Sequence, residues 1–264
     1  FLSQYGALPF GHNPERGWAA LRDAHQAQLP SMVQPLRSPE AERLARKLAE
    51  VTPGDLAITT LTNSGAETVE AAIKLARIRT GRSVILSTRN GFHGKTLGAL
   101  SATGKPLYQQ GFNAPAPDFD YLPFGDLAAL ETRLVAQGGE IAAFIFEPIQ
   151  GEGGVVCPPE GYVEAAIALC RKHGVLTILD EIQTGLGRTG AVDIVNNWAE
   201  LSGVTQFSAW TLSRTIRPRS FSTTYRRLGS PGAEVAKTGA LKPVATGVAT
   251  IWPTFGERSA TLCP

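Results

Sequence analysis

The stretch VLTILDEIQTGLGRTG at residues 175–190 decides the fold predicted for this chain. It opens with VLTIL, whose length and apolar, β-branched composition are typical of a buried parallel strand. The strand is followed by Asp180, Glu181 and Gln183 and then by a glycine-rich turn. Ligands of open α/β sheets bind beyond the carboxyl ends of the strands, so these polar residues are well placed for chemistry. A solvated aspartate at a strand end would give the same local pattern.

Composition narrows the class of protein. A chain of 264 residues is long enough to bury a sizeable core, as one large domain or two smaller ones. The net charge of +2 predicts neither a nucleic-acid partner nor an anionic membrane surface. We see no apolar run of the roughly 18 residues that a membrane span needs. The three cysteines are scattered without metal-binding spacing, which predicts no metal site and a reduced, cytoplasmic protein.

Strand and helix patterns alternate along the middle of the chain. The runs at 83–87 and 141–146 are predicted strands, and helices are expected at 15–28, 38–50, 127–137 and 158–172, with another following Ser64. Residues 98–126 contain four prolines and little periodicity, so we expect loops there. Alternation of this kind over residues 55–190 predicts an α/β fold with a doubly wound, mostly parallel sheet.

Three further blocks carry residues suited to chemistry. Ser64 and Glu67 have the spacing of a capping box, and a helix that begins with Gly65-Ala66 presents free backbone N–H groups to an anion. A capping box by itself is consistent with an ordinary helix start. The second block is FHGK at 92–95, and the third is EPIQGEGG at 147–154, directly after a predicted strand.

The blocks NSGAE, FHGK, EPIQGEGG and LDEIQTGLGRTG, in this order, resemble the class III aminotransferases, which depend on pyridoxal 5′-phosphate (PLP). The resemblance covers residues 11–190. It implies a fold-type I, PLP-dependent transferase-like large domain with helices flanking the sheet. It also implies transfer of an amino group from an amino donor to a 2-oxo acid, and a homodimer.

The resemblance also implies roles for individual residues. Asp180 pairs with the protonated pyridine nitrogen of PLP, which keeps the ring an electron sink. Gln183 bonds the ring hydroxyl, and Phe92 stacks on the ring. The residues expected to bind the cofactor are Ser64, Gly65, Ala66, Phe92, His93, Glu147, Asp180 and Gln183. Lys95 and Glu152 are expected to face the substrate, although acetylornithine-type members carry arginine where this chain has Lys95.

The resemblance ends at Gly190, and residues 191–264 form an atypical, irregular tail. The Schiff-base lysine of the family is expected about thirty residues after Asp180, but no lysine lies between Lys172 and Lys237. A disrupted reading frame would explain this change, and it makes the chain incomplete relative to the family. Lys237 and Lys242 are the fallback candidates. We therefore divide the chain into an N-terminal segment (1–50), a PLP-binding core (51–190) and the tail.

Two other interpretations stay open. The chain could be a non-catalytic or defective relative that binds PLP weakly or not at all. A Rossmann-like nucleotide-binding enzyme is the third possibility, but the G-x-G-x-x-G motif after a first strand is missing.

Overall fold

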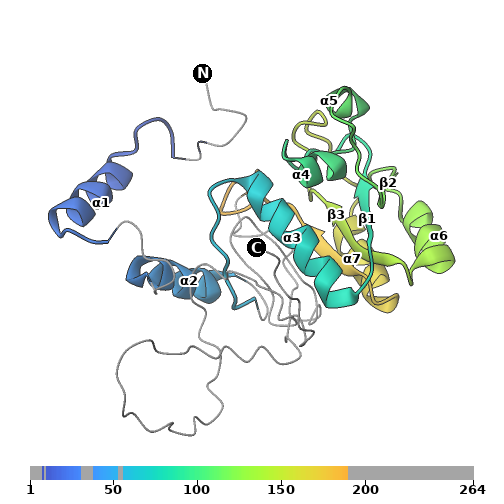
Figure 1. The fold of residues 1–264 in the computed structure, drawn as a ribbon, viewed down its shortest axis with the longest axis horizontal. Helices are drawn as coiled ribbons and strands as arrows, with labels where there is room; N and C mark the ends of the chain where they lie inside the picture. Colours follow the sequence, from blue (N-terminus) through green and yellow to red (C-terminus); the bar gives the residue numbers. More distant parts are fainter. Residues whose placement is uncertain (1–7, 9, 31–37, 53–55, 190–264) are drawn as a thin grey trace, which may run out of the picture.

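The computed structural model describes residues 8, 10–30, 38–52 and 56–189. Their centre is a four-stranded sheet in the order β2-β1-β3-β4, and every neighbouring pair of strands is parallel. Figure 1 shows the sheet between two layers of helices. The strands are β1 (Val84–Thr88), β2 (Phe119–Leu122), β3 (Ile141–Phe146) and β4 (Leu176–Leu179). This confirms the predicted α/β fold with a parallel sheet.

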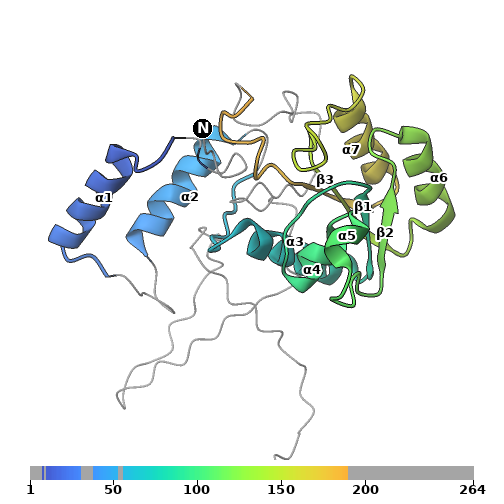
Figure 2. The same ribbon diagram turned by 90° about the horizontal axis from the view of Figure 1, so that it is seen from above.

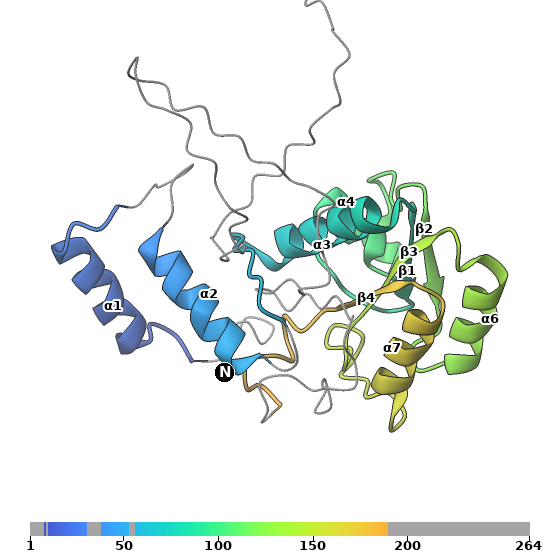
Figure 3. The same ribbon diagram turned by 90° about the horizontal axis from the view of Figure 1, so that it is seen from below.

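The helices supply the other two layers. Helices α3 and α4 cover one face of the sheet, and α6 and α7 cover the other (Figure 2). Helices α1 and α2 lie to one side of these layers (Figure 3). The helices are α1 (Glu15–Gln26), α2 (Pro39–Val51), α3 (Gly65–Thr80), α4 (Leu97–Ala102), α5 (Pro106–Gln109), α6 (Leu127–Gln137) and α7 (Tyr162–Lys172). Among the described helices, none is long and apolar enough to cross a membrane.

Alternating strand residues build two hydrophobic cores. Because successive side chains of a strand point to opposite faces, Phe144 packs with α6 and α7, whereas Ile145 packs with α3 and α4. All six residues of β3 are buried, as expected for a central parallel strand covered on both faces.

Several predicted boundaries needed correction. The region 98–126 is not only loops, because it contains most of α4, all of α5 and the edge strand β2. Every residue of β2 is only partly buried, so its sequence lacks the continuous apolar run of a central strand. Helix α7 begins at Tyr162 instead of residue 158, because Gly161 adopts a left-handed conformation (φ 73°) at its N-cap. The other predicted helices and strands were displaced by no more than two residues.

One arginine joins the turns at the amino-terminal edge of the sheet. Nη1 of Arg82, just before β1, donates hydrogen bonds to the carbonyl oxygens of Gly138, Ile141 and Gly174 at 2.9, 3.1 and 3.0 Å. Gly138 and Gly174 lie before β3 and β4, and Ile141 is the first residue of β3. The side chain therefore holds three strand starts together, at the end of the sheet opposite the predicted site.

Candidate active site

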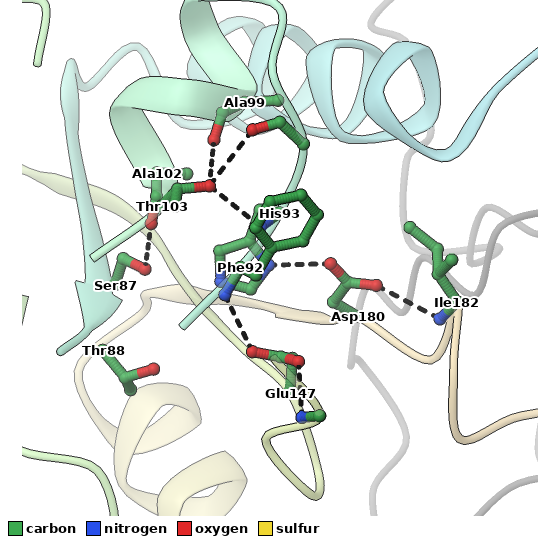
Figure 4. Close-up of polar contacts among 12 residues, drawn as sticks. Ser87, Thr88, Phe92, His93, Ala99, Ala102, Thr103, Glu147, Asp180 and Ile182 are labelled. Carbon is green, nitrogen blue, oxygen red and sulfur yellow. Dashed lines mark hydrogen bonds and ion pairs between the residues drawn. The ribbon is translucent and has the colours of Figure 1, made fainter. Parts of the chain in front are cut away.

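A buried pair of side chains lies at the carboxyl edge of the sheet. Nδ1 of His93, in the loop after β1, lies 2.7 Å from Oδ2 of Asp180, which follows β4 (Figure 4). Because an ionised carboxylate only accepts hydrogen bonds, Nδ1 is the donor. The side chains are 0% and 4% exposed. Among the described residues, the buried Nε2 of His93 finds no hydrogen-bond partner.

The backbone around this pair is also fixed by hydrogen bonds. Thr103 Oγ1 accepts a hydrogen bond from the backbone N–H of His93 at 2.9 Å. The other oxygen of Asp180 accepts the N–H of Ile182 at 3.1 Å, which shapes the turn after β4. Both members of the pair therefore have a defined orientation before any ligand binds.

Glu147 anchors a second strand end beside the pair. Its Oε2 accepts the backbone N–H of Phe92 at 2.9 Å, and its Oε1 accepts that of Gly151 at 3.1 Å. Burial raises the pKa of this carboxyl above its ordinary value, the charge of His93 lowers it in part, and the charge of Asp180 adds to the rise. Glu147 thus joins the loops after β1 and β3, although burial disfavours the charged form of its carboxyl group.

The start of α3 is capped as the sequence predicts. Ser64 Oγ, at the N-cap, accepts the N–H of Glu67 at 3.3 Å, which is the first bond of a capping box. Glu67 Oε2 accepts the N–H of Asn63, the residue before the N-cap, at 2.7 Å. The first N–H groups of a helix have no acceptor within it, so those of Gly65 and Ala66 are oriented for an anion.

Close contacts place this helix start beside the other blocks. A Cβ on Gly65 would lie 2.7 Å from Cδ1 of Ile182, so the helix approaches the turn after β4 as closely as glycine allows. Gly94 has φ +128°, and a Cβ there would lie 2.7 Å from Cβ of Ala66. The loop after β1 therefore lies directly against the first turn of α3.

Gln183 completes the group of converging residues. Its side-chain amide lies against the backbone of Gly151, where a Cβ would overlap it. All four sequence blocks thus meet at one edge of the sheet. The eight residues predicted to bind the cofactor lie on segments that contact one another there: Ser64, Gly65, Ala66, Phe92, His93, Glu147, Asp180 and Gln183.

The two predicted substrate residues lie further out, around a residue that the sequence did not single out. Tyr108 donates its hydroxyl hydrogen to Glu152 Oε1, and its ring packs edge-on against Phe92 with centroids 6.1 Å apart. The ammonium groups of Lys95 and Lys105 lie 5.9 and 5.3 Å from the centroid of the Tyr108 ring. Nζ of Lys105 donates a hydrogen bond to the backbone carbonyl oxygen of Glu152 at 2.6 Å. Lys95 and Glu152 are linked through Tyr108, which both of them contact.

A Schiff-base lysine and metal ligands are two further features that a site of this kind could contain. Lys237 and Lys242, the fallback candidates for the Schiff base, lie outside the described residues. Within the part of the chain that the structure describes, no group of three or more His, Cys, Asp or Glu is placed to hold a metal ion.

Comparison with known proteins identifies the family. Residues 1–202 match the family described as Aminotransferase class-III, and the chain belongs to this family of PLP-dependent transferases. It is 44% identical over 195 residues to a putrescine aminotransferase from Pectobacterium atrosepticum, covering 72% of this chain and 42% of that protein. It is 43% identical over 190 residues to the aminotransferase PigE of a Serratia species, covering 72% of this chain and 22% of that protein. The chain therefore spans less than half the length of these relatives.

Solved structures support the same family. The fold is similar to that of an (S)-enantioselective omega-transaminase from Thermomicrobium roseum, with a TM-score of 0.65 and 39% identity, over 73% of this chain and 48% of that one. It is also similar to the ornithine aminotransferase of Toxoplasma gondii, with a TM-score of 0.64 and 33% identity, over 73% and 46% of the two chains. That structure, crystallised in the presence of oxidised glutathione, showed partial occupancy of PLP at the protein active site.

Proposed function

We propose that residues 51–190 form the PLP-binding core of an aminotransferase, which transfers an amino group from an amino donor to a 2-oxo acid. The observation that carries the proposal is the carboxylate of Asp180, buried, held by His93 and adjacent to the capped start of α3. A buried carboxylate is stable when a cation or hydrogen-bond donors face it. A pyridinium N–H supplies both, so the residues present fit the cofactor.

Each residue of the site has a defined task in this proposal. Asp180 holds the proton on the pyridine nitrogen of PLP, and His93 keeps the carboxylate oriented toward it. The N–H groups of Gly65 and Ala66, with Ser64, bind the phosphate. Phe92 packs on one face of the ring, and Gln183 bonds the ring hydroxyl. When bound, PLP supplies the electron-withdrawing ring that stabilises a carbanion at the substrate.

A PLP titration tests the proposal. We expect the full chain to bind PLP, followed by absorbance and by quenching of tryptophan fluorescence. Asp180→Asn keeps the shape of the side chain but loses the charge, and we expect it to weaken binding about 10- to 100-fold. Asp23→Asn, on the exposed surface of α1, is the matched control and should bind as the wild type does. Equal affinity of the two variants would overturn the assignment of Asp180.

A second candidate function rests on the lysines. The sequence has no lysine between Lys172 and Lys237, which favours a relative that holds PLP without a covalent link. An amine nucleophile near the cofactor aldehyde also acts as the general base, and losing a positioned base costs about 10²- to 10⁴-fold in rate. We therefore expect PLP binding without measurable transaminase turnover. Trapping of PLP on Lys237 or Lys242 by borohydride, located by peptide mapping, would instead assign the Schiff base to a relocated lysine.

The substrate is proposed to enter beside Tyr108. Lys95 and Glu152 both contact this residue next to Phe92, so they would meet a substrate at the outer edge of the cofactor. Putrescine and ornithine, named for two of the relatives, are the amino donors to test first. We expect Glu152→Gln to change donor binding by the PLP-loaded chain, measured by calorimetry, while PLP affinity stays the same.

We also propose a homodimer. Leu97, Leu107 and Phe112 are 59%, 77% and 66% exposed on α4, on α5 and just after α5, and large exposed apolar side chains are common at subunit interfaces. We expect sedimentation to show a dimer that Leu107→Lys weakens. Val135→Lys on α6 changes an equally exposed apolar residue (68%) and should have no effect. A clean monomer for the wild type would contradict the dimer. Among the described residues, Cys157 and Cys170 are free thiols, which fits the cytoplasmic location that we propose.

A further inference from the structure

Glu70 links α3 to the start of α4. Its Oε1 accepts hydrogen bonds from the Thr96 hydroxyl at 2.7 Å, from the Gly98 N–H at 2.8 Å and from the Ala99 N–H at 3.2 Å. The first N–H groups of a helix have no acceptor within it and carry positive partial charge. A carboxylate from the neighbouring helix satisfies two of them here. Glu70 is not among the candidate site residues described above.

Gly98 makes this approach possible. A Cβ at Gly98 would overlap the carboxylate of Glu70, including both of its oxygens. The backbone of Gly98 does not have a positive φ, so a side chain here would be opposed by the closeness of Glu70 and not by backbone conformation. The carboxylate and the backbone are fitted to each other.

A second contact lies one helical turn away. Ala66 and Glu70 are four residues apart and therefore share one face of α3. Gly94 packs against Ala66, and residues 96–99 bond to Glu70. The chain after Gly94 thus lies along the first two turns of α3 and is fixed to it at two points, on either side of Lys95.

We propose that Glu70 is a positioning residue, which sets the loop 92–95 relative to the start of α3. The proposal rests on the proposed function, because this loop carries Phe92 and His93 and the start of α3 carries the phosphate contacts. The loop would hold the ring of PLP, and the start of α3 would hold its phosphate. A loop already held against the helix start loses less conformational entropy when both segments bind the cofactor.

Three variants of the full chain test this role. Glu70→Ala removes the acceptor, Glu70→Gln keeps an oxygen that can accept the same hydrogen bonds, and Glu164→Ala removes an exposed helical glutamate of α7 as the control. The first readout is hydrogen exchange of residues 92–99 without PLP. The second is the dissociation constant for PLP at a temperature where every variant is folded.

We expect Glu70→Ala to speed exchange of the Gly98 and Ala99 amides and to weaken PLP binding, each by about tenfold. Glu70→Gln should restore most of both, and Glu164→Ala should change neither. Gly98→Ala should reproduce the effect of Glu70→Ala by displacing the carboxylate. If Glu70→Ala fails to fold, Thr96→Val removes one of the three donors and should shift both readouts in the same direction.

The outcomes separate the two proposals. Unchanged exchange in Glu70→Ala would overturn the role of Glu70 in holding the loop. Faster exchange with PLP affinity equal to that of Glu164→Ala would make Glu70 merely structural, and the proposal would be wrong. A wild-type chain that does not bind PLP would overturn the proposed function and the cofactor half of this proposal, whereas the exchange readout would still decide whether Glu70 holds the loop.

Discussion

His93 Nδ1 and Asp180 Oδ2 lie 2.7 Å apart and join two loops that are 87 residues apart in the sequence. The His93 side chain is 0% exposed and the Asp180 side chain is 4% exposed, so the contact between them is buried. The pair therefore has two consequences. It orients a carboxylate toward the proposed cofactor, and it ties the end of β1 to the end of β4.

The energetic coupling of this pair is the first prediction. We expect His93→Ala and Asp180→Ala each to lower the free energy of unfolding by about 2–4 kcal/mol without PLP, because each leaves a buried polar partner unsatisfied. The double variant should lose about 1–3 kcal/mol less than the sum of the two. Urea unfolding of the four proteins measures the coupling. Strict additivity would mean that the contact contributes nothing to stability.

The approach of the loop to α3 is the second prediction. Gly94→Ala forces a left-handed φ on alanine and places Cβ 2.7 Å from that of Ala66, so we expect a loss of about 2–3 kcal/mol. Gly139→Ala introduces a Cβ into open space and should change the free energy of unfolding by less than about 0.5 kcal/mol. Thermal and urea unfolding of both variants provide the comparison. Similar losses in the two would contradict the close packing at Gly94.

The pH dependence of stability at Glu147 is the third prediction. Burial raises the pKa of this carboxyl, so folding favours its protonated form. Its contribution is therefore fully present below the pKa of the unfolded state and is lost as the pH rises through the folded pKa. We expect the free energy of unfolding of the wild type, relative to Glu147→Gln, to fall as the pH rises above about 4.3, the ordinary pKa of a glutamate. A difference that rises with pH would mean that the bonds from Phe92 and Gly151 outweigh burial.

The reactivity of two cysteines is the fourth prediction. Cys170 is buried in α7, and burial raises the pKa of its thiol to about 12, whereas Cys157 is exposed. Because the thiolate is the nucleophile, Cys170 should react with iodoacetamide at least about 10²-fold more slowly than Cys157 in the native protein. Peptide mapping after timed alkylation measures each residue separately. In urea the two rates should become similar, and fast native labelling of Cys170 would contradict the packing of α7.

The fold was predictable where a local pattern coincides with burial. Residues 141–146 were predicted as a strand with the observed limits, because a strand covered on both faces must be apolar at every position. The strand β2 was missed because an edge position, with partial burial throughout, imposes no such pattern. The start of α7 at Tyr162 was missed because it depends on the left-handed conformation of Gly161. Glycine permits this conformation but does not require it, so the sequence alone does not show it.

The candidate site was predictable where its residues form a contiguous sequence motif. The sequence blocks placed Asp180 and Phe92 at strand ends, and the parallel topology brought these ends together. Tyr108, Thr103 and Glu70 were missed, because each acts through a contact distant in sequence. For Glu70 one signal was available, its position one turn after Ala66 on the same face of a predicted helix.

The hydrogen bonds of Arg82 have a consequence for substitutions at the two ends of the sheet. Its three hydrogen bonds close the amino-terminal edge of the sheet, while the residues proposed for PLP all gather at the carboxyl edge. The strands are therefore joined at both ends, by Arg82 at one and by the His93–Asp180 pair at the other. A variant that has lost the His93–Asp180 pair still keeps the hydrogen bonds of Arg82, so the starts of β1, β3 and β4 stay joined when the carboxyl edge changes.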